Sequence, residues 1–90
     1  MQIKTKSGFE FEFDEAVLKD WNVIEAIAMA DNKSNSTEQI RGIVNLAKIL
    51  LGDELENLKA YIADKNEGHV PLDVMGAEVM SVLEAAGQGN

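Results

Sequence analysis

The chain has 90 residues, of which 46% are hydrophobic and 27% charged, and its 16 acidic and 8 basic residues give a formal net charge of −8. This length predicts one domain, and the absence of cysteine excludes a disulfide framework and a thiolate metal site. The acidic balance argues against nucleic-acid binding, which needs clustered basic residues, and no apolar run approaches the roughly 18 residues of a membrane span. With no apolar core typical of a signal peptide at the start, we expect a cytoplasmic protein.

A β-hairpin is expected at about residues 2–13, where apolar and polar side chains alternate in two runs rich in strand-forming residues. Such a period of two is typical of strands that bury one face. The apolar face of the hairpin would comprise Ile3, Thr5, Phe9, Phe11 and Phe13.

The turn of this hairpin determines its register. A two-residue turn would place Lys4 opposite Phe11 and mix charge with the aromatic face. A three-residue loop over residues 6–8 avoids this and leaves Gly8 at the left-handed position that such loops favour. We therefore predict the pairs Gln2–Glu12, Ile3–Phe11, Lys4–Glu10 and Thr5–Phe9.

Two helical segments follow the hairpin. Asp14 can cap a short turn over residues 15–19, and Asp20 can cap a helix over residues 21–30. The pattern also allows one bent helix that includes both segments. A polar loop covers residues 31–36. The expected apolar side of the second segment consists of Trp21, Val23, Ile24, Ile27 and Ala28.

A longer helix is expected at about residues 37–51. Ser36 and Gln39 have the spacing of a capping box, with Ser36 at the cap. Gly42 would cost this helix about 1 kcal/mol relative to alanine, which indicates close packing at that position. The apolar stripe of the helix consists of Ile40, Ile43, Val44, Leu46, Ala47, Leu50 and Leu51.

The last third of the chain predicts two more helices. Asp53 and Glu56 form a second candidate capping box after Gly52, for a short helix that ends near Asp64. A turn covers residues 65–68. Pro71 can start the final helix, Gly87 is expected to end it, and residues 88–90 are expected to fray. One side of the final helix carries Leu72, Met75, Val79, Val82, Leu83 and Ala86.

These elements predict an α+β fold that is mainly α-helical, with the N-terminal hairpin followed by four or five short helices. A single domain would span residues 1–90, with the hairpin in 1–13, the helical part in 14–87 and the frayed tail in 88–90.

The chemistry-bearing residues do not predict an enzyme, a cofactor or a metal. His69 is the only histidine and lies in a predicted turn without a partner imidazole or thiol. No nucleophile elbow is present. Residues 64–68 are similar to the start of a calcium loop, but Met75 stands where the bidentate glutamate should be. The acidic residues are explained by solvated surfaces and helix starts, because no apolar pocket accompanies them.

The apolar residues instead predict self-association and partner binding. A lone two-stranded hairpin is marginal in water and has two unpaired edges, so it would pack on the helices and contact other subunits, for example by strand addition. The helical faces would form the core, and any part left open would receive helices of a client protein. The candidate contact residues are Ile3, Phe9, Phe11, Phe13, Ile40, Ile43, Val44, Met75, Val79 and Val82.

The order of segments along the chain resembles a known family. The chain opens with KTKSGFEFEFDE and LKDW, continues through a polar loop to a helix ending in KILLG, and has GHVP before a final amphipathic helix. This order is similar to that of the small tail assembly chaperones of siphophages and prophages of Gram-positive bacteria. The similarity spans nearly the whole chain and includes no catalytic motif.

The resemblance implies a role in the bacterial host cytoplasm. Proteins of this family bind the long tape measure protein and keep it soluble while the tail tube polymerises around it. They self-assemble, and many also exist as a frameshifted longer form that shares the N-terminal domain. The present chain, which ends in AAGQGN, would correspond to the short form.

A second hypothesis remains open at this point. An acidic chain of this size could be a small regulator, such as an inhibitor or an antitoxin-like protein, that masks a basic partner. Such a module would bind through its carboxylates, so its binding would weaken steeply with salt.

Overall fold

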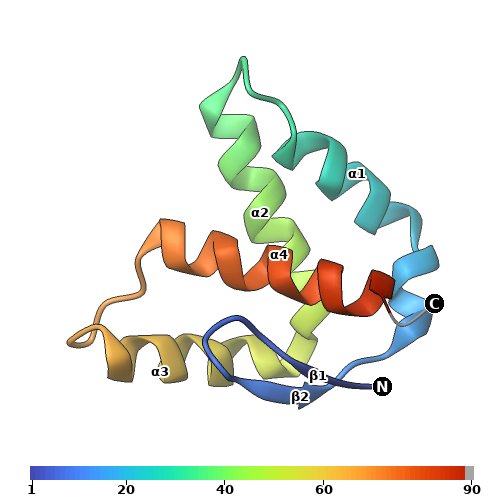
Figure 1. Cartoon of the computed structure of the whole chain (residues 1–90). Coiled ribbons are helices and arrows are strands. Elements are labelled where there is room, and N and C mark those ends of the chain that lie inside the picture. Colours follow the sequence, from blue (N-terminus) through green and yellow to red (C-terminus); the bar gives the residue numbers. More distant parts are fainter. Residues whose placement is uncertain (89–90) are drawn as a thin grey trace.

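A computed structural model describes residues 1–88 of the chain (Figure 1). It confirms the α+β class, with a two-stranded antiparallel hairpin followed by helices. The predicted frayed tail is described only at Gln88, since residues 89–90 lie outside the described part. The elements are β1 (Gln2–Lys4), β2 (Glu10–Glu12), the 3₁₀ segment η1 (Glu15–Lys19), α1 (Trp21–Ala30), α2 (Ser36–Leu51), the 3₁₀ segment η2 (Gly52–Glu54), α3 (Leu55–Lys65) and α4 (Leu72–Gln88).

The final helix, α4, runs through the middle of the molecule (Figure 1). It contacts α2, α3 and β1, so this C-terminal helix packs against both the N-terminal hairpin and the helices in between. Helix α1 packs along α2 on one side of α4, and α3 and the hairpin lie on the other side (Figure 1). Helix α2 crosses behind α4 and leads to α3 (Figure 1). The core forms where these groups meet, and Val79 and Val82 of α4 are completely buried in it.

The predicted register of the hairpin is confirmed. Ile3 pairs with Phe11, and the flanking pairs are Gln2–Glu12 and Lys4–Glu10. Beyond the strands, the Thr5 amide donates to the Phe9 carbonyl at 2.8 Å. Gly8 has a φ of +100°, the left-handed conformation that the three-residue loop requires.

The two segments after the hairpin are separate elements rather than one bent helix. Asp14 caps η1 by accepting a hydrogen bond from the Ala16 amide at 3.0 Å. Asp20 caps α1 in the same way, through the Asn22 amide at 2.8 Å. The backbone of Asp20 is extended, with φ −73° and ψ 130°, and this residue interrupts the helical path between η1 and α1.

The expected apolar side of α1 was partly wrong. Val23 is buried as predicted, but Trp21 is 70% exposed and Ile24 55% exposed. The buried side of α1 is shifted toward Ala26 because this helix packs on α2 through small residues. A Cβ added to Gly42 of α2 would lie 2.3 Å from the Ala30 nitrogen, which confirms the close packing that this glycine indicated.

Both predicted capping boxes were wrong. Asn35, rather than Ser36, caps α2, and its side chain accepts from the Glu38 amide at 3.1 Å. Asn35 takes this role because its backbone is extended while Ser36 is already helical. The 3₁₀ segment η2 delays the start of α3, which has no side-chain cap at Glu54.

The start of α4 agrees with the prediction and its end does not. The Met75 amide donates to the Pro71 carbonyl at 3.0 Å, so the helix begins directly after the proline. Gly87 was expected to end the helix, but α4 continues to Gln88. A glycine ends a helix when it takes a left-handed conformation, and Gly87 has no positive φ.

A buried carboxylate that the sequence did not predict holds the hairpin on α4. Glu78 is only 1% exposed. Its Oε1 accepts hydrogen bonds from the hydroxyls of Thr5 and Ser7, both at 2.5 Å, and its Oε2 accepts from the Ser7 amide at 2.9 Å. The Lys6 amide donates to Ser81 Oγ at 3.1 Å beside them. The loop of the hairpin is therefore attached to the middle of α4.

Replacing Glu78 with alanine is expected to lower the free energy of unfolding by roughly 1–3 kcal/mol, because three donors of the hairpin loop would lose their acceptor. Urea unfolding followed by circular dichroism measures this change. Glu84→Ala is the matched control, since Glu84 is an exposed residue of the same helix. Equal unfolding midpoints for the two variants would contradict a stabilising role for the Glu78 contacts.

Candidate functional site

The apolar hairpin residues proposed as contact residues lie inside the protein. Ile3, Phe11 and Phe13 are buried, and Phe9 is half-buried with its ring centre 5.5 Å from that of Tyr61. These side chains contribute to packing, as predicted. Ile3, Phe11 and Phe13 are covered within the chain itself and are not exposed for subunit contacts, whereas part of Phe9 remains accessible. Strand addition at the hairpin edge stays a prediction.

The helical candidate residues divide into a buried and an open group. Val79 and Val82 belong to the core. Ile43 and Met75 are half-buried, whereas Val44 is 42% exposed and Ile40 41% exposed. The part of the predicted helical surface that remains open therefore lies on α2 and on the first half of α4.

Three helices enclose an apolar groove of about 350 Å³ at this place. It brings together four of the predicted residues, Ile43, Val44, Met75 and Val79. Ile40 does not line it, although it lies one turn from Val44 on α2. The other lining residues are Ala47 and Lys48 of α2, Leu55, Glu56 and Lys59 of α3, and Val70 and Leu72 at the start of α4.

Two local features of the sequence lie next to this groove. Gly76 of α4 faces α2, where a Cβ at this glycine would lie 3.9 Å from Ile43 Cδ1. At the far end of α3, Glu67 and Gly68 have φ of 57° and 88° and reverse the chain. This reversal returns Val70 and Leu72 to the groove, and Leu72 remains half-exposed there.

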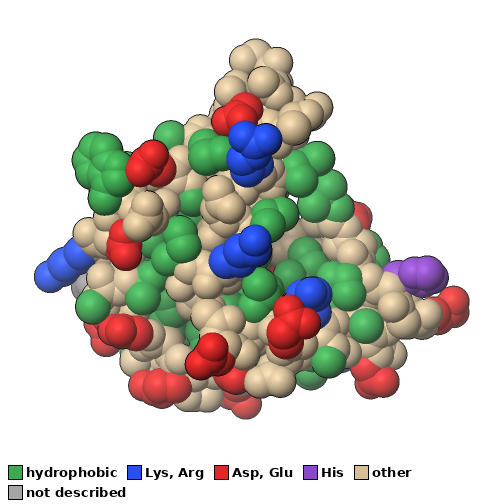
Figure 2. Space-filling model, turned by 180° about the vertical axis from the view of Figure 1, so that it is seen from behind, with side chains coloured by type: hydrophobic (Ala, Val, Ile, Leu, Met, Phe, Trp, Pro, Cys, Tyr) green, Lys and Arg blue, Asp and Glu red, His purple; other side chains and the backbone are tan. Residues whose placement is uncertain are grey.

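The groove is more positive than the rest of the protein. Lys48 and Lys59 line it together with one acidic residue, Glu56. Glu56 pairs with Lys59 at 3.1 Å, while Lys48 has no ion pair within 4 Å among residues 1–88. Figure 2 shows exposed apolar side chains between basic side chains on the face seen from behind. An apolar segment that carries carboxylates would complement this surface.

His69 is exposed in the turn before α4. Within residues 1–88, no group of three or more histidine, aspartate or glutamate side chains could hold a metal ion. No helix in the same range has the length and apolar character to cross a membrane.

Sequence reasoning missed the contribution of α3 and of the turn before α4. The sequence did not single out Leu55, Lys48, Lys59 or Val70, which all line the groove. One signal was present, since Val70 is an apolar residue in a polar turn directly before the helix-starting Pro71. The approach of α3 to α2 is a tertiary feature that helical periodicity does not report.

Comparisons with protein-family models, with curated proteins and with solved structures found no match to this chain.

Proposed function

We propose that this protein is a non-enzymatic chaperone of phage tail assembly that holds an amphipathic helix of the tape measure protein in its groove. The open apolar groove between α2, α3 and α4 is the observation that carries this proposal. The order of segments along the chain supports the role in tail assembly, because it is similar to that of the small tail assembly chaperones.

The groove has the chemistry for a helical client. An amphipathic helix presents apolar side chains at positions i, i+3, i+4 and i+7 to such a surface. Val44, Leu72 and Met75 would cover these side chains and keep them from aggregating. Lys48 and Lys59 would contact acidic residues beside the apolar stripe of the client.

The proposal places the protein in the cytoplasm of a bacterial host. The chain would act as the short form, associate with copies of itself and with a frameshifted longer form, and leave before the tail is complete. No catalytic residue or cofactor takes part in this function.

Co-expression tests the client. A tape measure protein encoded directly downstream of this chain is expected to remain in the soluble fraction when the two are produced together. A glutamate at Val44 is expected to abolish this protection, because it places a charge in the groove. Ile40→Glu is the matched control, since Ile40 has the same exposure on the same helix but does not line the groove.

The amount of soluble client in each strain separates the outcomes. Protection by wild-type protein and by Ile40→Glu, but not by Val44→Glu, would support the groove. Equal protection by all three would exclude it as the client site. Titration of purified protein with client peptides at increasing salt tests the acidic-regulator hypothesis, which requires binding to weaken steeply between low and moderate salt.

A further inference from the structure

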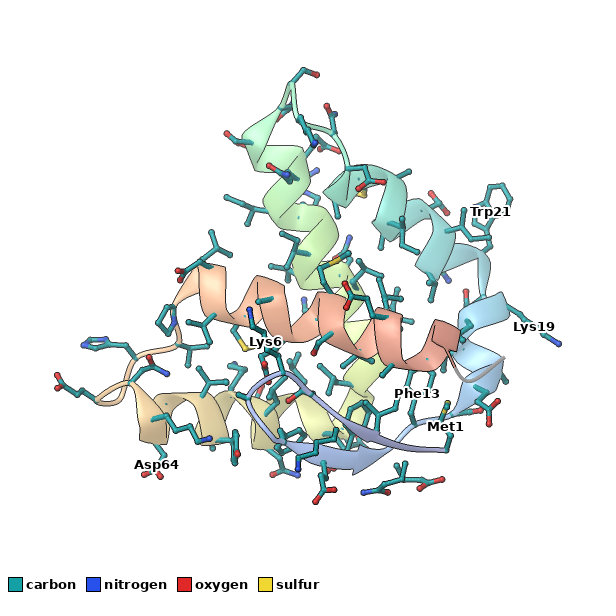
Figure 3. The ribbon with its side chains drawn as sticks, viewed as in Figure 1. Met1, Lys6, Phe13, Lys19, Trp21 and Asp64 are labelled. Atoms are coloured by element: carbon teal, nitrogen blue, oxygen red, sulfur yellow. The ribbon has the colours of Figure 1, made fainter. Side chains whose placement is uncertain are left out.

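Helix α1 exposes an apolar ridge that the fold does not cover. The ridge consists of Trp21, Ile24 and Ala28, which follow one another at helical spacing and lie on the same side of α1. Trp21 points away from the body of the molecule (Figure 3). An exposed tryptophan next to an exposed isoleucine is a feature of contact surfaces, where aromatic anchors contribute much of the binding energy.

Acidic residues lie at both ends of α1 and beside the ridge. Residues 20–31 contain three acids and no lysine or arginine. Glu25 lies beside the ridge on α1, and Asp20 and Asp31 are the residues that flank the two ends of this helix. The groove offers the opposite arrangement, with apolar walls between Lys48 of α2 and Lys59 of α3. Ridge and groove are therefore complementary in both apolar character and charge.

The ridge cannot enter the groove of its own molecule. Helix α1 packs along α2 through the close approach of Ala26 and Ala30 to Gly42, and this leaves the ridge on the outer side of the pair. Trp21 thus points away from the chain that bears it, and Ile24 is exposed on the same helix. Only a second molecule can bring the two surfaces together.

We propose that the α1 ridge of one copy docks into the groove of a second copy. The contact is heterologous, because it joins two different surfaces, and each dimer still offers one free groove on one copy and one free ridge on the other. Chains or closed rings of subunits follow from this geometry. The inference rests on the proposed function in that it uses the same groove, so a neighbouring subunit and a client helix would compete for it.

Two complementary variants test this contact. The double variant Trp21→Ala, Ile24→Ala removes the ridge and keeps the groove, whereas Val44→Glu blocks the groove and keeps the ridge. In sedimentation velocity at tens of micromolar, wild-type protein is expected to form dimers and larger species. Each variant alone is expected to be monomeric, and an equal mixture of the two is expected to form one-to-one dimers and nothing larger.

Met80→Ala is the control, since Met80 is an exposed residue of α4 outside the groove and this variant should associate like wild type. Association by the ridge variant alone, or monomers in the equal mixture, would overturn the proposal. A monomeric wild-type protein would also overturn it. The ridge variant has an intact groove and is expected to protect the tape measure protein, so failure of self-association is distinguishable from failure of the chaperone role.

Discussion

Replacing Phe11 with aspartate is expected to unfold the protein. Phe11 is 3% exposed on the inner face of the hairpin, where it packs between Phe9 and Phe13. Loss of a buried phenylalanine alone costs about 3–5 kcal/mol, and a carboxylate in the same place finds no cation to offset its desolvation. Typical domains have only about 5–15 kcal/mol of stability, so this change removes most of it.

Far-ultraviolet circular dichroism and urea unfolding measure this effect. Glu10→Asp is the control, because it places an aspartate next to Phe11 in sequence but on the outer face of the hairpin. The control is expected to stay within about 0.5 kcal/mol of wild type. An unchanged unfolding midpoint in the Phe11 variant would refute the hairpin register and its burial.

A second large effect is expected when Gly42 is replaced with alanine. The added Cβ would lie 2.3 Å from the Ala30 nitrogen and 2.7 Å from the Ala26 carbonyl oxygen. Both neighbours belong to the backbone of α1, which cannot rotate away as a side chain can. The helices must separate, at a cost of about 1–3 kcal/mol or more.

The same substitution at Gly76 is expected to have the opposite sign. Gly76 lies within α4, and the nearest atom to an added Cβ would be Ile43 Cδ1 at an ordinary contact distance of 3.9 Å. Alanine has a higher helix propensity than glycine, so Gly76→Ala should raise the free energy of unfolding by up to about 1 kcal/mol. Equal shifts at the two positions, measured by thermal or urea unfolding, would contradict the close contact between α1 and α2.

The hairpin could be predicted in detail because its determinants are local. Alternation of apolar residues identifies the strands, and the position of Gly8 selects a loop that keeps lysines away from the phenylalanine face. Pattern alone was less informative on α1, whose residues are apolar on most sides. Gly42, far along the chain, determines that Ala26 rather than Ile24 faces α2.

The candidate site could be predicted only in part for the same reason. Periodicity identified Val44 and Met75 as members of apolar faces, but not which of them would remain open. That division depends on how α3 approaches α2, which no local pattern encodes. Glu78 is the clearest example of a contact that local sequence patterns do not predict, because its partners Thr5 and Ser7 lie 73 and 71 positions earlier in the chain.

The attachment of the hairpin to Glu78 has a consequence for biosynthesis. The hairpin is synthesised well before the helix that holds it, because Thr5 and Glu78 are 73 residues apart. At elongation rates of about 5–20 residues per second, roughly 4–15 seconds separate the two events. During this interval α4 cannot cover the phenylalanine face of the nascent chain, so the native attachment of the hairpin must wait until α4 has been synthesised.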